Sequence, residues 1–212
     1  HDGSTAGGFK IGVGDFPTGT NNVALGNTAL DDLDGSSPGG NNTAVGHDAL
    51  TANTTASFNT AMGHNALGVN TTGGDNVAMG YNALDANTTG DNNTAIGTQA
   101  LTSNTTADNN VAVGKNALKI NATGTRNVAV GSEALEQNTG SDNVAIGYLA
   151  LDTNTSGSNN TAVGTECMDA NTTGSANVAM GYRALDANTT GSDNVAIGQS
   201  ALGANTTASN NT

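Results

Sequence analysis

The sequence has few of the side chains from which large globular cores are built. Its 212 residues contain no Trp, and aromatic residues make up 3% of the chain. Charged residues are also scarce, at 11%, against roughly 25% in an average globular protein. The shortage of aromatics argues against one large core, and the shortage of charge argues against a self-repelling disordered tail. A chain rich in Asn, Thr, Gly and Ala with these limits is typical of an elongated, repetitive β structure.

Positive charge, cysteine and long apolar runs are equally rare. Only 5 residues are Lys or Arg, and the net charge is -13. An acidic surface repels phosphate, which argues against nucleic-acid binding and against an anionic membrane surface. No run of about 18 apolar residues is present, so the sequence predicts no membrane insertion. Cys167 is the single cysteine, which excludes a disulfide framework within the chain.

One motif, Asn-(Val/Thr)-Ala-apolar-Gly, recurs through most of the chain. Eleven complete copies are followed by the start of a twelfth at Asn211. Successive copies begin about 17 residues apart, with one longer interval after the first copy and one shorter interval after the seventh. The copies begin at Asn22, Asn42, Asn59, Asn76, Asn93, Asn110, Asn127, Asn143, Asn160, Asn177 and Asn194. The repeat divides the chain into an N-terminal segment, 1–21, and a repeat region, 22–212.

The full unit, N-[VT]-A-Φ-G-x-x-A-L-x-x-N-T-T-G-x-x, is numbered here as positions 1 to 17, where Φ is a large apolar residue. Positions 2 to 4 predict a short strand, with positions 2 and 4 on one face and Ala at position 3 on the other. The Ala-Leu pair at positions 8 and 9 predicts a second short segment, and Asn-Thr-Thr-Gly has turn chemistry. One unit is too small to bury its apolar face, but stacked copies bury it in continuous ladders.

The predicted fold is therefore all-β: a repetitive β-solenoid, of the parallel β-roll or β-helix kind, with coils of about 17 residues. Its core is expected along position 9, which holds Leu50, Leu67, Leu84, Leu101, Leu118, Leu135, Leu151, Met168, Leu185 and Leu202.

The repeat also predicts how chains associate. The Ala residues at positions 3 and 8 would form small apolar strips, so we expect chains to pack side by side as a parallel homotrimer or another fibrous assembly. The segment 1–21 holds Phe9 and Phe16 and is expected to cover the first coil, as terminal repeats require. The last coil breaks off at Thr212, so either the protein continues or subunits stack end to end into a filament.

The Asn-(Val/Thr)-Ala-apolar-Gly element resembles the head repeats of trimeric (YadA-like) autotransporter adhesins. The longer unit, as in Asn177-Val-Ala-Met-Gly-Tyr-Arg-Ala-Leu-Asp-Ala-Asn-Thr-Thr-Gly, is similar to repeats of phage tail-fibre proteins and large bacterial surface proteins. The resemblance spans residues 22–212 and implies a trimeric fibre that is extracellular, on a cell surface or on a virion. The autotransporter repeat is shorter than the unit found here, so its coil geometry need not carry over. An adhesive fibre with a host-surface or glycan ligand is the function that this resemblance implies.

The sequence shows neither a nucleophile–base pair nor a metal-ligand cluster, so it predicts no enzyme activity and no cofactor. The Asn at position 12 starts an Asn-x-(Ser/Thr) sequence in nine units, which fits either N-glycosylation or a turn whose Asn side chains form a hydrogen-bonded ladder. These nine are Asn53, Asn70, Asn87, Asn104, Asn121, Asn154, Asn171, Asn188 and Asn205. Turn chemistry alone accounts for the motif, which favours the ladder.

A ligand-binding solenoid without fibre assembly is the alternative. Four units carry Asp-x-Asn-x-(Thr/Ser)-Gly, the first half of a calcium loop without its Glu, beginning at Asp85, Asp152, Asp169 and Asp186. The paired Thr residues at positions 13 and 14 suggest ice binding, although neighbouring side chains of a strand point to opposite sides.

Position 6 holds the remaining candidates. It carries Tyr81, Tyr148 and Tyr182, which suit contacts with sugars or proteins. It also carries His47 and His64, which fit a metal-binding pair or, given the variety of residues at this position, exposed loop residues.

Overall fold

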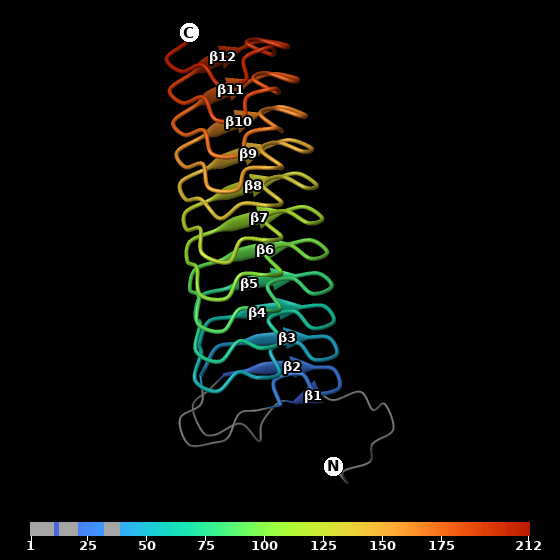
Figure 1. Ribbon diagram of the computed structural model, residues 1–212. Helices are drawn as coiled ribbons and strands as arrows, with labels where there is room; N and C mark the ends of the chain where they lie inside the picture. Colours follow the sequence, from blue (N-terminus) through green and yellow to red (C-terminus); the bar gives the residue numbers. More distant parts are fainter. Residues whose placement is uncertain (1–10, 13–20, 32–38) are drawn as a thin grey trace.

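The computed structural model describes residues 11–12, 21–31 and 39–212, and in these residues the chain forms a rod of stacked coils (Figure 1). Each coil, called a rung below, contributes one short strand to a single sheet. The strands are β1 (Ile11–Gly12), β2 (Val23–Leu25), β3 (Thr43–Val45), β4 (Thr60–Met62), β5 (Val77–Met79), β6 (Thr94–Ile96), β7 (Val111–Val113), β8 (Val128–Val130), β9 (Val144–Ile146), β10 (Thr161–Val163), β11 (Val178–Met180) and β12 (Val195–Ile197).

The strands β2 to β12 pair in parallel, each with the next along the chain, and identical positions of the unit lie opposite one another. Ala78 of β5 is paired with Ala95 of β6, and Ala95 in turn with Ala112 of β7. The same register holds across the one longer and the one shorter interval of the repeat. The predicted β-solenoid, with one coil for each repeat unit, is therefore confirmed.

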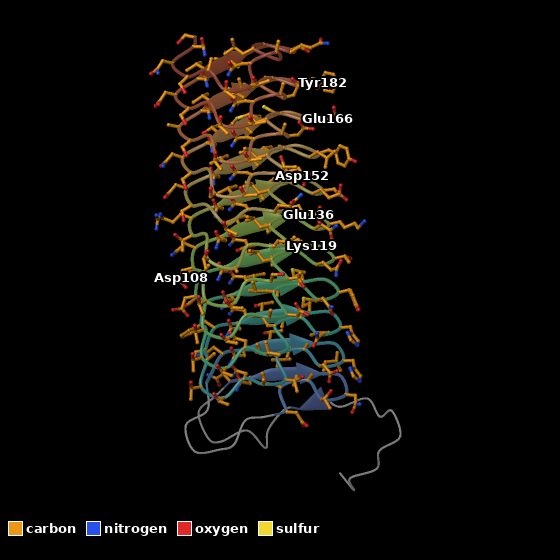
Figure 2. All side chains as sticks on the ribbon, in the orientation of Figure 1. Asp108, Lys119, Glu136, Asp152, Glu166 and Tyr182 are labelled. Atoms are coloured by element: carbon orange, nitrogen blue, oxygen red, sulfur yellow. The ribbon has the colours of Figure 1, made fainter. Side chains whose placement is uncertain are left out.

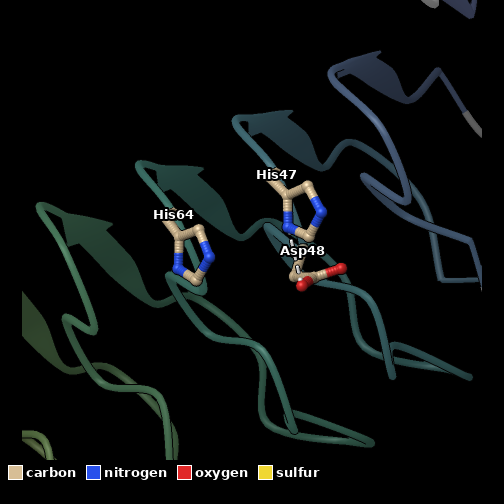
Figure 3. A group of neighbouring side chains, drawn as sticks. All are labelled: His47, Asp48 and His64. Atoms are coloured by element: carbon tan, nitrogen blue, oxygen red, sulfur yellow. Dashed lines mark ion pairs between the residues drawn. The ribbon is translucent and has the colours of Figure 1, made fainter. Parts of the chain in front are cut away.

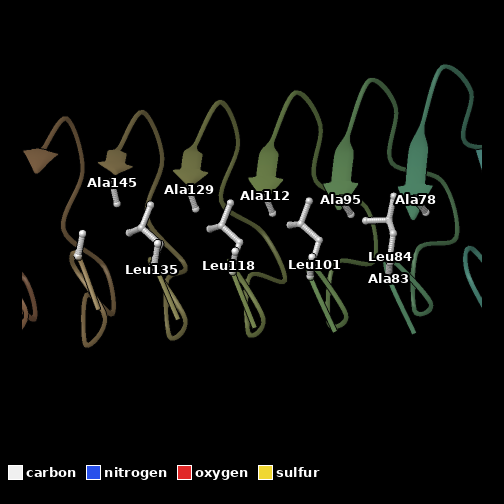
Figure 4. Packing of buried hydrophobic residues seen from close by; sticks show 14 of the residues in the cluster. Ala78, Ala83, Leu84, Ala95, Leu101, Ala112, Leu118, Ala129, Leu135 and Ala145 are labelled. Carbon is white, nitrogen blue, oxygen red and sulfur yellow. The ribbon is translucent and has the colours of Figure 1, made fainter. Parts of the chain in front are cut away.

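The interior of each rung is narrow, and it holds the small face of the strand. Ala at position 3 and Ala at position 8 are buried, as is the Leu at position 9 that faces the strand from the opposite wall (Figure 4). Leu50 through Leu185 of the position 9 series, Met168 included, are fully enclosed, and Leu202 packs against them while partly exposed. One large side chain per rung fills the space, so the residue that meets it must be small.

This arrangement reverses the prediction of which strand face lies inside. The Ala strips at positions 3 and 8, expected between chains, are the inner wall of the rung, while positions 2 and 4 face outward. Alternation along a strand separates two faces but does not say which of them is buried. The large apolar residues of position 4 do stack on one another, but on the outside of the rod.

The predicted second extended segment at positions 8 and 9 forms turns instead. The Leu or Met at position 9 has a φ between 49° and 54° in every described rung, which is left-handed backbone. This conformation turns the chain back toward the sheet and points the side chain into the rod. Burial of a Leu side chain, worth about 1.5–3 kcal/mol, offsets the cost of the left-handed backbone, about 1–2 kcal/mol.

The glycine at position 5 allows the rungs to stack. Gly97 has a φ of +137°, and a Cβ placed on it would lie 2.4 Å from the carbonyl oxygen of Gly114 in the next rung. The same conflict recurs from Gly26 to Gly181. Any side chain at this position would therefore hold two rungs apart.

At the first rung, β1 runs antiparallel to β2, with Ile11 opposite Leu25 and Gly12 opposite Ala24. It occupies the edge of β2 that no other rung covers. The rest of the predicted cap, residues 1–10 and 13–20, lies outside the described residues, and so do Phe9 and Phe16.

Candidate functional site

The outer face of the sheet is a surface feature that runs through all eleven rungs of the repeat. Positions 2 and 4 of eleven rungs form two parallel columns of Val, Thr, Leu, Ile and Met, without a charged residue. Its most exposed members are Val23, Met62, Met79, Ile96, Val130, Ile146, Met180 and Ile197, with exposed fractions between 36% and 69%. An uncharged face of this length on a chain of net charge -13 marks a surface that is suited to contact with another apolar surface.

Two ladders of buried Asn side chains line the rest of the interior. At position 1, the backbone N–H of Asn76 donates to Oδ1 of Asn59 in the preceding rung (3.0 Å), and its own Nδ2 donates to the Gly90 carbonyl (2.8 Å). At position 12, Nδ2 of Asn87 donates to Oδ1 of Asn70 (2.8 Å) and to the same Gly90 carbonyl (3.0 Å). Buried amides cost free energy unless they are bonded, and these bonds meet that demand in most rungs.

These ladders decide what the Asn-x-(Ser/Thr) sequences can do in the folded chain. Eight of the nine candidate Asn side chains are completely buried, from Asn53 to Asn188, and Asn205 in the last rung is partly exposed. The nitrogen that would carry a glycan is enclosed and donates inside the rod, as in Asn171, which bonds Asn154 (2.8 Å). The folded structure therefore favours the ladder over glycosylation at these eight positions.

The Asn side chains that the proposed calcium loops would use belong to the interior ladder. Oδ1 of Asn87, which would join Asp85 on an ion, accepts from Asn104 (2.9 Å). The corresponding oxygens of Asn154, Asn171 and Asn188 accept from the next rung in the same way. The Asp85 carboxylate instead accepts from Thr102 (2.6 Å) and Asn65 (3.3 Å).

The other three Asp candidates belong to a row of carboxylates at position 10. Glu136, Asp152, Asp169 and Asp186 follow one another in successive rungs, and Figure 2 shows Lys119, Glu136 and Asp152 along this edge. Lys119 pairs with Glu136 (3.1 Å) at one end, and Arg183 pairs with Asp186 (2.8 Å) at the other.

Two carboxyl groups in this row, Asp152 and Asp169, have raised pKa values. Burial raises the pKa of Asp152 to about 6, and the neighbouring charges of Glu136, Glu133 and Asp169 act in the same direction. Burial and the carboxylates of Asp186 and Glu166 also raise the pKa of Asp169. Burial and neighbouring carboxylates therefore favour the protonated form of both side chains in the folded chain.

The threonines and tyrosines lie on the outside of the rod. At position 13 the hydroxyls donate along the stack, Thr71 to the Thr88 carbonyl and Thr88 to the Thr105 carbonyl (3.0 Å each). These hydroxyl hydrogens are therefore not free to order water. Tyr148 and Tyr182 are about half exposed at position 6 and remain candidates for ligand contact.

A row of rings lies at position 6 of three neighbouring rungs. The imidazoles of His47 and His64 are stacked with centroids 5.2 Å apart and planes inclined by 5°. The ring of Tyr81 stacks on the other side of His64, at 5.5 Å. Asp48, at position 7, approaches His47 Nδ1 to 2.7 Å through Oδ2 (Figure 3), and its Oδ1 accepts from the Thr28 hydroxyl.

Sequence reasoning missed three features of the structure. The Asn ladder at position 1 could have been found from the invariance of a poor strand former next to a strand. The outward direction of positions 2 and 4 had no signal in the sequence. Asp48 was overlooked, although it follows His47 directly and lies in the unit before that of His64.

Cys167 takes the place of an Ala at position 8 and is buried. Burial raises the pKa of its thiol to about 11, which disfavours the reactive thiolate form.

No family model, no curated protein and no solved structure matches the chain. Within the described residues, no helix has the length and apolar character needed to cross a membrane.

Proposed function

We propose that this chain is the rigid segment of an extracellular fibre, in which copies of the solenoid pack laterally through the outer sheet face. The single observation that carries the proposal is the uncharged double column at positions 2 and 4, at least partly exposed in every rung. A soluble protein rarely leaves so continuous an apolar face uncovered.

The size of the face supports lateral packing. Eleven rungs about 4.8 Å apart give a length on the order of 50 Å, and two side-chain columns about 7 Å apart give a width of about 10 Å. Each chain would then bury about 500 Å², and a pair about 1,000 Å², which is the lower limit for a specific interface. Three chains with their faces turned toward one axis would bury about 1,500 Å² together.

The repeat supports a partner of the same kind. A second copy presents side chains at the same spacing, so each rung of one chain meets a rung of the other. A parallel homotrimer is the assembly we propose, because it turns all three apolar faces inward and leaves the variable positions 6, 7, 10 and 11 on the outside. Those positions include Tyr148 and Tyr182 and would carry the adhesive contacts to a host surface or glycan.

The test compares the chain with a variant in which the outer face is charged. Ile96→Glu with Val111→Glu places two carboxylates in the middle of the face, and Thr89→Glu places one on an exposed turn as the control. Light scattering after size exclusion should give trimers for the parent chain and the control, and monomers for the double variant. Electron micrographs should show rods.

A parent chain that stays monomeric at all concentrations would overturn the proposal. Thermal hysteresis from such a monomer would favour the ice-binding alternative. The ice-binding surface would then be the outer sheet face, because the Thr hydroxyls at position 13 donate along the stack.

A further inference from the structure

We propose that His47, Asp48 and His64 form a binding site for a divalent transition-metal ion of the zinc class, on the outer edge of the rod between the rungs of β3 and β4. One ligand atom from each residue lies within 4.8 Å of the other two. Within the described part of the chain, this is the one group of three such residues that meets that distance.

The distances fit one ion after a small adjustment. Zinc binds imidazole nitrogen at about 2.0–2.1 Å and carboxylate oxygen at about 2.0–2.2 Å, so two ligand atoms on one tetrahedral ion lie about 3.4 Å apart. The present atoms lie within 4.8 Å of one another, so a decrease of up to about 1.5 Å in their separations brings them into that geometry. The side chain of His47 is 51% exposed and that of Asp48 34%, so rotation of the side chains suffices and the backbone need not move.

The surroundings hold the ligands in place. The Thr28 hydroxyl bonds one oxygen of Asp48, which leaves the other oxygen directed at His47. Tyr81 stacks against His64 on the side away from His47, with ring centroids 5.5 Å apart (Figure 3 shows the two imidazoles). Such supporting contacts are what orient metal ligands in proteins.

The chemistry selects the class of ion. Two imidazoles and one carboxylate suit Zn²⁺, Cu²⁺ or Ni²⁺, whereas Ca²⁺ and Mg²⁺ take oxygen ligands. The net charge of -13 raises the local concentration of any cation. Three protein ligands leave coordination positions open to water or to a group from another molecule.

The test is titration of the full chain with Zn²⁺ alone at pH 7.5, followed by calorimetry and by the melting temperature. We expect one ion per chain and a higher melting temperature in its presence, since an ion that binds only the folded state stabilises it. His64→Asn and His47→Asn, which introduce a residue that position 6 already holds at Asn27, should weaken binding more than about 100-fold. Loss of a supporting group alone costs about 10–100-fold, and loss of a ligand costs more.

Two controls separate this site from other zinc ligands in the chain. His1→Ser removes the third histidine and should leave the affinity unchanged, and Asp169→Asn should leave it unchanged although it removes a carboxylate. Binding at pH 5 should be weaker than at pH 7.5, because the imidazoles must be deprotonated. Equal affinity of the parent chain and His64→Asn, or loss of binding in His1→Ser, would overturn the proposal.

Discussion

The stacking glycine at position 5 gives the sharpest test of how the rungs are held together. In Gly97→Ala, the new Cβ would lie 2.4 Å from the Gly114 carbonyl oxygen and 2.6 Å from its carbonyl carbon. To make room, the rungs of β6 and β7 must separate where Gly114 N–H donates to the Ile96 carbonyl (2.8 Å) and Asn116 N–H donates to the Thr98 carbonyl (3.0 Å).

The expected loss of unfolding free energy in Gly97→Ala has two parts. A non-glycine residue in such backbone costs about 1–3 kcal/mol. Weakening two buried backbone hydrogen bonds adds about 1–3 kcal/mol for each group left without a partner. We therefore expect Gly97→Ala to lower the free energy of unfolding by about 3–9 kcal/mol.

The chain provides its own control for the cost of backbone strain. Gly198 has a φ of +119°, but a Cβ added there meets nothing within 4 Å. Gly198→Ala should therefore cost only the backbone strain, about 1–3 kcal/mol. Urea unfolding followed by circular dichroism, at one fixed protein concentration, measures both variants. Equal losses for the two variants, or a Gly97→Ala variant as stable as the parent chain, would refute the explanation by rung contact.

Three further predictions concern the interior and the charged edge. Leu101→Met should cost less than about 1.5 kcal/mol, as Met168 already fills this position, whereas Leu101→Ala should cost about 2–5 kcal/mol in denaturant unfolding. Asn87→Ala should cost about 1–3 kcal/mol by the same assay, since Oδ1 of Asn70 then lacks its donor. Asp152→Asn should stabilise the chain at pH 7 and not near pH 3.5, with melting temperature against pH as the measurement.

The sign of the Asp152 prediction follows from its pKa. Between pH 3.8 and about 6 the folded chain keeps a proton on Asp152 that the unfolded chain has released. The stability that protonated Asp152 contributes to the folded state is therefore present at low pH and lost as pH rises through about 6. The full shift corresponds to about 3 kcal/mol, and solvent screening of a partly exposed carboxylate reduces the expected gain to about 1 kcal/mol. A variant that is stabilised equally at both pH values would contradict this cause.

The stacking register could be predicted from the sequence because the repeat itself encodes it. A unit that returns at a nearly constant spacing, with Ala, Gly and Leu at fixed positions, can satisfy all of them only if like residues lie over like. In the shortened unit that begins at Asn127, the rest of the stacking register is kept although one residue is missing. Asn138 in that unit still bonds the Gly140 carbonyl (2.8 Å), so the missing residue shortens only the turn.

The direction of the strand face could not be predicted, for a physical reason. Whether Ala95 or Ile96 points inward depends on the width of the rung, and the left-handed turn at Leu101 sets that width. A Leu with positive φ has no recognisable sequence signal. Asp48 in the rung of β3 also has left-handed backbone, with a φ of 55°, and the sequence gives no signal for it.

The central claim is that identical positions of the unit lie one rung apart along a straight axis. Spin labels at Tyr81→Cys and Tyr182→Cys, in a Cys167→Ala background and diluted with unlabelled chain, test it by pulsed electron resonance. Six rungs separate the two positions, so the account predicts a narrow distance distribution near about 29 Å. A broad distribution centred near about 55 Å, as for a flexible chain of that length, would contradict it.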